Sequence, residues 1–340
     1  MILDEIKKIC ENKGTIPLDK LNMDSNVGRL KPSKDDKWLG TYLEKSRFDI
    51  LSESNFKEDI LNYIKSFNIE HILNYDLGDY TCDVFFPTHN ICFKFLDLFN
   101  YSEINVHKKH QLNTFKEFNK NGYRIIQIFE DTWLKKRIIV ESRIQNLLGN
   151  SATKIYGRKC SIKEINDTSI ITEFLNANHL QGAVGSRIKL GLYFEEKLVG
   201  LMTFGKLRKN LGQKSNSDND YEMMRFCTLL NTSILGGASK LFKHFIKLYN
   251  PDSITSYADK CWSSLDNVYK KLNINHIHDS EPSYFYIIGT RRKGRFGYRK
   301  DVLLEAGYDP NIWTEHTICL DKNIYRIYDC GTSKYLWKKH

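Results

Sequence analysis

The sequence contains no two cysteines in C-x-x-C spacing, an absence that argues against a zinc ribbon or finger. It also lacks any apolar run near the roughly 20 residues that a helix needs to cross a bilayer. The amphipathic, early acidic start differs from a secretory signal peptide. The eight cysteines stand singly, several of them in apolar runs, as in proteins of a reducing compartment. We therefore expect a cytoplasmic protein that does not enter a membrane.

Composition predicts a globular chain with an anionic partner. The 340 residues are 41% apolar and 13% aromatic, which is enough for two domains with their own cores. The formal net charge is +10. Nucleic acid is the usual partner of such a basic protein, although a lysine excess is also common in chains rich in Asn, Ile and Lys. We expect double-stranded DNA as the partner.

Hydrophobic patterning divides the chain into four parts. Residues 1–52 hold a short helix candidate and polar sequence, and we expect an arm of unknown role. Residues 53–150 give the order helix, two strands, helix, strand, helix, which predicts an α/β domain. Residues 151–288 predict a second α/β domain with a strand hairpin. Residues 289–340 form a basic appendage that ends in a predicted hairpin over 324–337.

Two carboxylates of the first domain form a candidate metal site. Glu58 lies on the first predicted helix and Asp83 on the first long strand. Phosphodiester hydrolysis usually uses a divalent metal that activates water, and Mg²⁺ prefers carboxylate oxygens. One acid on a helix and one on a strand is a generic arrangement, however. The alternative interpretation is a solvated Glu58 and an Asp83 that caps its strand.

Four runs of the first domain resemble the very-short-patch-repair type (Vsr-like) endonucleases, especially their phage homing-endonuclease relatives. The resemblance covers about residues 52–149. It is carried by Phe56-Lys-Glu58-Asp-Ile60, by Tyr80-Thr-Cys-Asp83-Val-Phe-Phe-Pro87, by the run from Asn90 to Glu103, and by the run from Asn121 to Trp133. It implies a restriction-endonuclease-like PD-(D/E)xK fold. It also implies Mg²⁺-dependent cleavage with Glu58 and Asp83 as catalytic metal ligands.

The first domain departs from this family at three positions. Lys94 stands where the family usually has an acid or another polar group, Leu96 where Asn or His is frequent, and Tyr101 within the place of a His-bearing motif. His107 and His110 lie nearby as substitutes for the missing imidazoles, or else as polar residues of an exposed helix. These departures imply that cleavage is weakened or lost.

The second domain contains a glycine pair directly before a predicted helix. Unpaired backbone N–H groups at such a helix start suit a pyrophosphate, because the positive end of the helix dipole lies there. A plain junction between a loop and a helix is the alternative. The candidate cofactor-binding residues are Gly236, Gly237, Ala238 and Ser239.

The order of elements in the second domain, about residues 154–288, resembles the GNAT acyltransferase fold, and its motifs resemble the Mom family of phage DNA-modification proteins. The motifs are Asn178-His-Leu-Gln-Gly182, Leu198-Val-Gly-Leu-Met-Thr-Phe-Gly205, Arg225, and Ser256-Tyr-Ala-Asp259 with the following Val268-Tyr269. This resemblance implies an acyl-CoA cofactor and a site lined by Asp259 and Tyr269. Ser233 stands where the usual loop begins with Gln or Arg. The alternative interpretation of Asp259 is a structural acid at a strand end.

A basic run in the appendage is a candidate DNA contact. It carries cations and two aromatic residues without an acid, a composition that suits phosphates and unpaired bases. A solvated surface is the alternative. The candidate DNA-binding residues are Arg291, Arg292, Lys293, Arg295, Arg299 and Lys300.

These observations lead to one favoured function and two alternatives. The favoured function is a DNA-binding protein of the phage or mobile-element homing-endonuclease type, with metal-dependent cleavage weakened or lost. The first alternative is a Mom-like, acyl-CoA-dependent transferase that modifies DNA bases. The second is a catalytically inactive DNA-binding or interaction protein. The expected fold is α/β: a Vsr-type domain, a GNAT-like domain and a basic appendage.

Overall fold

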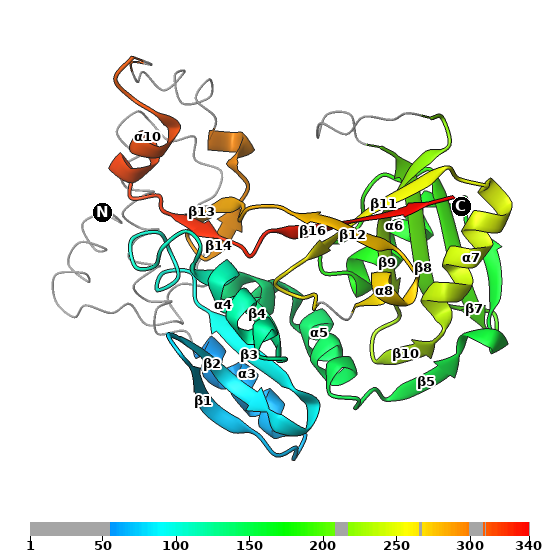
Figure 1. The fold of residues 1–340 in the computed structure, drawn as a ribbon, viewed down its shortest axis with the longest axis horizontal. Helices are drawn as coiled ribbons and strands as arrows, with labels where there is room; N and C mark the ends of the chain where they lie inside the picture. Colours follow the sequence, from blue (N-terminus) through cyan, green and yellow to red (C-terminus); the bar gives the residue numbers. More distant parts are fainter. Residues whose placement is uncertain (1–54, 208–216, 265–266, 299–308, 310, 340) are drawn as a thin grey trace, which may run out of the picture. The chain divides into compact units, whose positions relative to one another are not determined.

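The computed structural model describes residues 55–207, 217–264, 267–298, 309 and 311–339 (Figure 1). The predicted arm at residues 1–52 lies outside this part. The chain divides into two compact units, a larger one of residues 56–285 and 326–340 and a smaller one that includes residues 286–325. None of the helices in the described part is long and apolar enough to span a membrane.

The larger unit begins with a four-stranded sheet and three helices. The elements are α3 (Phe56–Lys65), β1 (Ile72–Leu77), β2 (Tyr80–Phe86), η3 (Pro87–His89), β3 (Ile91–Leu96), α4 (His110–Lys120), β4 (Arg124–Phe129) and α5 (Glu130–Leu147). The sheet order is β1-β2-β3-β4, with β3 and β4 parallel and the other pairs antiparallel. The mixed α/β character expected for this segment is confirmed, and a Vsr-type nuclease fold is not shown by it.

The core of this first sheet is built around β3, which is buried along its whole length. A central strand covered on both faces carries a continuous apolar run rather than an alternating one. Helices α3 and α5 are joined at their surface by Asp59, whose carboxylate accepts hydrogen bonds from Trp133 Nε1 at 3.0 Å and Arg137 Nη1 at 2.6 Å. The charged residues at this edge therefore fix how the two helices pack.

A seven-stranded sheet forms the rest of the larger unit. Its order is β12-β16-β11-β9-β8-β7-β6, and β9 and β11 are its parallel pair. The strands are β6 (Ser161–Glu164), β7 (Ile188–Phe194), β8 (Lys197–Lys206), β9 (Asp220–Thr228), β11 (Ser253–Asp259), β12 (Asn275–Asp279) and β16 (Thr332–Lys338). A short parallel ladder joins β5 (Thr153–Tyr156) to β10 (Thr232–Leu235). The helices are α6 (Thr168–Asn178), α7 (Gly237–Tyr249) and α8 (Val268–Lys271), with η4 at Gly157–Lys159.

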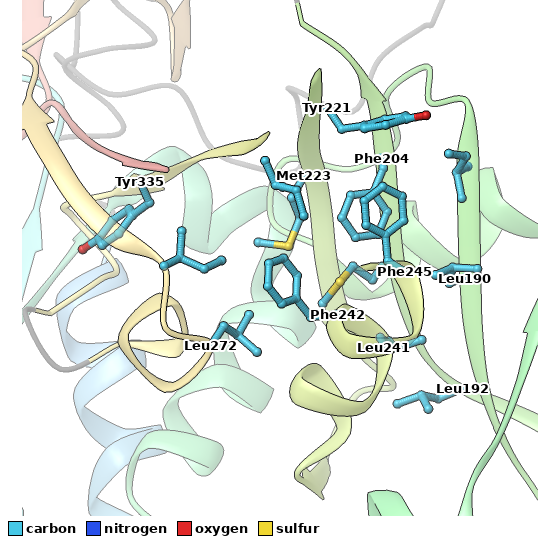
Figure 2. Close-up of a cluster of buried hydrophobic side chains, with 14 of the residues drawn as sticks. Leu190, Leu192, Phe204, Tyr221, Met223, Leu241, Phe242, Phe245, Leu272 and Tyr335 are labelled. Carbon is cyan, nitrogen blue, oxygen red and sulfur yellow. The ribbon is translucent and has the colours of Figure 1, made fainter. Parts of the chain in front are cut away.

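Helix α7 supplies one side of the core beneath the seven-stranded sheet (Figure 2). Its apolar residues Leu241, Phe242 and Phe245 recur at helical spacing and are buried. The ring of Phe245 stacks on that of Phe204 of β8, and Tyr221 of β9 meets it edge-on. Burial of these three large apolar side chains stabilises the packing of α7 against β8 and β9.

The structure differs from the sequence-based expectation at the C-terminus. The predicted hairpin over 324–337 does not form, because β16 enters the seven-stranded sheet between β11 and β12 (Figure 1). Strand β15 (Arg326–Tyr328) is short and separate from that sheet. Helix α8 is a single turn, which Asn267 caps by accepting the N–H of Tyr269.

In the smaller unit, the described basic run begins as a strand. β13 (Tyr284–Ile288) and β14 (Arg291–Lys293) pair antiparallel, and η6 (Arg295–Tyr298) follows. Helix α10 (Glu315–Asp321) begins at Thr314, whose hydroxyl accepts the N–H of Thr317. The Tyr286 hydroxyl donates a hydrogen bond of 2.8 Å to Glu315.

Candidate functional site

The parallel strands β9 and β11 diverge toward their carboxyl ends. Their ladder joins Ser253, Ile254 and Thr255 to Asp220, Tyr221 and Glu222. Past this point β9 continues to Thr228 and β11 to Asp259, and these described residues form no further pairs between the two strands. The Ser256 hydroxyl donates to the Met223 carbonyl at 3.0 Å, just where the ladder ends. Carboxyl ends of parallel strands are a usual place for ligands in α/β sheets.

Asp259 is the last residue of β11 and starts a tight turn. Its Oδ1 accepts the N–H of Cys261 at 2.9 Å, and its carbonyl accepts the N–H groups of Trp262 and Ser263. The residue is partly exposed. The turn fixes the carboxylate of Asp259 at the point where β11 leaves the sheet.

Arg143 of α5 is the cation beside Asp259. Its guanidinium lies over the Trp262 ring, 4.8 Å from the centroid. Burial lowers the pKa of Arg143, and the charge of Asp259 opposes that shift. The Nε atom of Arg143 is buried without a hydrogen-bond partner among the described residues. An unsatisfied buried donor is costly, so an acceptor supplied by a ligand would stabilise it.

His179 follows the end of α6 and is held neutral. Its Nδ1 accepts the N–H of Gln181 at 3.1 Å, which leaves the proton of the neutral ring on Nε2. Burial, followed by the charges of Arg225 and Arg143, lowers the pKa of His179 to about 3. His179 is therefore a neutral hydrogen-bond donor at physiological pH and not a cation.

Arg225 and Cys227 of β9 complete what we call the strand-end cluster, defined as Arg143, His179, Arg225, Cys227 and Asp259. The guanidinium of Arg225 donates to the Gly182 carbonyl at 3.0 Å. Burial raises the pKa of Cys227 to about 12, although Arg143 and Arg225 oppose the shift. The cysteine is thus a thiol and not a nucleophilic thiolate. Two cations and one acid leave the strand-end cluster with a net positive charge.

Tyr269, predicted to line the site, holds the backbone of β11. Its hydroxyl donates to the Tyr257 carbonyl at 3.0 Å and lies 3.1 Å from the Ser256 hydroxyl. Its ring stacks on Tyr335 at 4.4 Å between centroids. Burial raises the pKa of Tyr269. These contacts make Tyr269 a support for β11, and a role in proton transfer stays a prediction.

Each glycine of the pair at the start of α7 is required for a different physical reason. Gly236 caps the helix at φ +75°, where glycine is favoured, and a Cβ on it would meet open space. A Cβ on Gly237 would lie 2.7 Å from the Ile234 side chain. Within the described part of the chain, no side chain caps this helix start. The open space at Gly236 and the first-turn amides, which no described side chain caps, suit an anionic group such as a phosphate.

The η4 turn covers the other flank of this helix start. A Cβ on Gly157 would come within 3.0 Å of the Gly236–Gly237 backbone. Lys240 Nζ donates to the carbonyls of Gly157 and Cys160. Part of the glycine requirement is therefore close packing of backbone on backbone.

The predicted metal ligands do not form a metal centre with other residues. The described residues contain no group of three or more His, Cys, Asp and Glu side chains positioned to hold a metal ion. Asp83 accepts the N–H of Phe95 at 2.7 Å and lies 3.8 Å from Lys57 Nζ. Glu58 is exposed on α3. The described residues therefore give no support to Glu58 and Asp83 as Mg²⁺ ligands.

The basic run is described only up to Tyr298. Arg291, Lys293 and Arg295 are exposed, and Arg292 is partly buried opposite Ile287. Arg299 and Lys300 lie outside the described residues. The contact of the basic run with DNA stays a prediction.

Sequence reasoning missed Arg143 and gave no role to His179 or Arg225. His179 and Arg225 belong to the motifs that resemble the Mom family, so the sequence could have suggested a role for them. Arg143 gave no such signal. It is one of many cations in a helix, and only the folded chain brings it close to Asp259.

Comparisons with solved structures return acetyltransferases over about half of the chain. A Bacillus subtilis acetyltransferase in complex with CoA is 12% identical, covering 54% of this chain and 100% of its own, with a TM-score of 0.32. A GNAT family acetyltransferase from Elizabethkingia anophelis with acetyl-CoA bound is 9% identical, covering 53% and 99%, with a TM-score of 0.29. A putative acetyltransferase from Salmonella typhimurium with its cofactor acetyl-CoA is 11% identical, covering 53% and 94%, with a TM-score of 0.30.

Likeness at this level assigns neither a family nor a function. No protein-family model matches the sequence, and no curated protein matches it significantly.

Proposed function

We propose that this chain is an acyltransferase that uses an acyl-CoA donor and modifies DNA. The observation that carries the proposal is the strand-end cluster at the divergent ends of β9 and β11. A sheet opened at one parallel pair leaves main-chain groups that a ligand can pair with, and the cluster places charge beside them. The endonuclease alternative has less support, since the described residues hold no metal-ligand group.

The uncapped start of α7 is the proposed seat of the donor's phosphates. The first-turn amides point away from the helix without intrahelical partners, and the helix dipole favours an anion there. Gly236 leaves the approach open. A bound CoA thioester would supply an activated acyl carbonyl.

The strand-end cluster supplies the polar groups that acyl transfer needs. Asp259 is a carboxylate fixed by its turn and suits accepting a proton from an attacking amine. His179 carries its proton on Nε2 and suits donating a hydrogen bond to an oxygen that gains charge. Arg143, whose Nε is unsatisfied within the described residues, suits a phosphate of the acceptor. Each role belongs to a residue whose state follows from its contacts.

DNA as the acceptor rests on charge. The net charge of +10 and the exposed cations of β14 favour a polyanion. The amino groups of the bases are the natural acceptors of an acyl group in DNA.

Binding of the donor is tested with an introduced charge at the start of α7. Gly236→Asp places an acid beside the proposed phosphate seat, and we expect the Kd for acetyl-CoA in calorimetry to rise at least tenfold. Gly78→Asp is the matched control, because Gly78 also has positive φ and open space around its Cβ, at +61°. Gly236→Asn separates charge from backbone strain. No heat of binding to the wild-type chain, or equal Kd values for all variants, would refute the donor site.

A further inference from the structure

A cavity in the first sheet of the larger unit has no part in the proposed transferase. Its volume is about 380 Å³, within the range of small-molecule sites, roughly 300–1,000 Å³. Its lining is almost wholly polar or charged. The residues are Lys57, Asp79, Thr81, Lys94, Asp97, Asn100, Tyr101, Val106 and His110.

Lys94 is the unusual member of this lining. It projects from the buried strand β3 and is only 8% exposed. Its Nζ donates a hydrogen bond of 2.7 Å to the Thr81 hydroxyl and lies 5.7 Å from the centroid of the Tyr101 ring. Among the described residues no carboxylate forms an ion pair with it within 4.0 Å. Buried lysines are usually paired, so an unpaired lysine amine in a cavity calls for a function.

The neighbouring acids are occupied by a different lysine. Lys57 Nζ lies 3.8 Å from Asp83 and 3.7 Å from Asp97, and it also approaches the Tyr101 ring. Asp83 is further engaged by the N–H of Phe95. Lys57 thus attracts the carboxylates and adds a second cation near Lys94, an arrangement that favours the neutral, nucleophilic amine.

Burial lowers the pKa of Lys94, and Lys57 acts in the same direction. Asp83, Cys82 and Asp76 oppose that shift. Burial and Lys94 also lower the pKa of His110, which lines the same cavity. His110 is therefore available as a neutral base.

From this geometry we propose that Lys94 is a nucleophilic amine that forms an imine with the aldehyde of a deoxyribose phosphate, as exposed at an abasic site in DNA. The cavity holds an amine, a neutral imidazole and the hydrogen-bonding groups of Thr81 and Asn100. An aldehyde flanked by phosphate suits a nucleophilic amine with the cation of Lys57 beside it. The proposal shares only the DNA substrate with the transferase function and uses a separate site.

The reaction balances without a metal, an oxidant or a reductant. The Lys94 lone pair attacks C1′ of the open-chain sugar, a C–N bond forms, and the carbonyl oxygen leaves as water. The iminium then withdraws electrons, a proton leaves C2′ to a base such as His110, and the C3′–O bond breaks with the electron pair leaving on the phosphate. Water finally hydrolyses the unsaturated imine and returns the amine of Lys94.

The experiment traps the imine. The full chain is incubated at neutral pH with an abasic-site duplex and sodium cyanoborohydride, and the modified peptide is mapped by mass spectrometry. We expect a covalent adduct on Lys94 and none with the intact duplex. Lys94→Arg keeps a long basic side chain but removes the nucleophilic amine, so the adduct should fall at least tenfold. Lys65→Arg, an exposed lysine at the end of α3, should leave the yield unchanged.

The outcomes decide the proposal even if Lys94→Arg folds poorly, because the adduct is mapped in the wild-type chain. Adducts spread over exposed lysines, or absent from the Lys94 peptide, would overturn it. An adduct on Lys94 with free 2-deoxyribose 5-phosphate but not with the abasic duplex would overturn DNA as the source. Loss of acyl transfer in a separate assay would leave this proposal standing, since neither outcome depends on the other.

Discussion

At the scale of single residues, the strand-end cluster shows how burial sets charge states. Arg143 and Arg225 lie close enough to His179 to disfavour a third cation, and Asp259 alone offsets them. Cys227 keeps its proton for a different reason, the loss of solvent around its sulfur. A site with two guanidiniums, one carboxylate and two neutral groups favours an anionic ligand.

The neutral state of His179 predicts a dependence of stability on pH. Its pKa is about 3 in the folded chain and about 6.5 when unfolded, so the unfolded state binds the proton first as pH falls. The free energy of unfolding is therefore not reduced by His179 above about pH 6.5. Below that pH it falls progressively, down to about pH 3. Melting temperatures at pH 7.5 and 5 measure this loss.

His179→Asn should show a smaller fall in melting temperature between the two pH values than the wild type does. His107→Asn, at an exposed position on the way to α4, is the control and should fall as much as the wild type. An equal fall in all three proteins would show that His179 titrates normally.

Part of the site was accessible from the sequence at this scale. Asp259 was expected to line the site through the resemblance of Ser256-Tyr-Ala-Asp259 to the Mom family, and the structure places it at the end of β11, where its carboxylate accepts the N–H of Cys261. The contact of Arg143 with Trp262 was not predicted, because contacts between distant segments depend on packing and not on local pattern. The two contacts of the Tyr269 hydroxyl were hidden for the same reason.

At the scale of elements, the packing of α7 controls the geometry of the candidate donor site. Phe245 is fully buried and meets Phe204 and Tyr221. Phe245→Ala should lower the free energy of unfolding by about 3–5 kcal/mol, through a smaller transfer energy and a new cavity. Leu248→Ala on the exposed side of the same helix should cost less than about 0.5 kcal/mol. Urea denaturation measures both, and similar losses would contradict the packing described.

The packing of η4 on α7 makes a second prediction. Gly157→Ala would place a methyl group 3.0 Å from backbone atoms of Leu235, Gly236 and Gly237, none of which is a flexible side-chain end. We expect a destabilisation of about 1–3 kcal/mol, as in overpacked cores. Gly185→Ala, where a Cβ meets open space, should be nearly neutral. Equal melting temperatures for the two variants would show that η4 does not press on the start of α7.

Elements with strong local patterns were predicted closely, and those that depend on distant partners were not. The helix expected after the glycine pair and the strand hairpin expected in the second domain both form, as α7 and as β7–β8, because apolar spacing and a polar turn define them locally. β16 was expected in a hairpin, yet it pairs with β11 and β12. This pairing depends on strands that lie far away in the sequence, so the local pattern does not reveal it. Strand β12 has an exposed, polar pattern and gave no signal of its own.

At the scale of the whole molecule, the charge of +10 predicts binding to DNA that weakens with salt. Replacing Arg291, Arg292 and Lys293 with Ala should reduce the slope of log K against log salt by about 0.9 for each phosphate that is no longer neutralised. Fluorescence anisotropy with a duplex at several salt concentrations measures the slope. An unchanged slope would remove β14 from the DNA interface.

The most direct test of the proposed function is transfer of a labelled acyl group from acetyl-CoA to DNA by the full chain. The account predicts label on the nucleosides, abolished in Asp259→Asn and kept in Asp76→Asn, a matched change of an exposed strand acid. Mass spectrometry of the digested DNA identifies the modified base. DNA that stays unlabelled with the wild-type chain, or labelling that survives Asp259→Asn in full, would contradict the account.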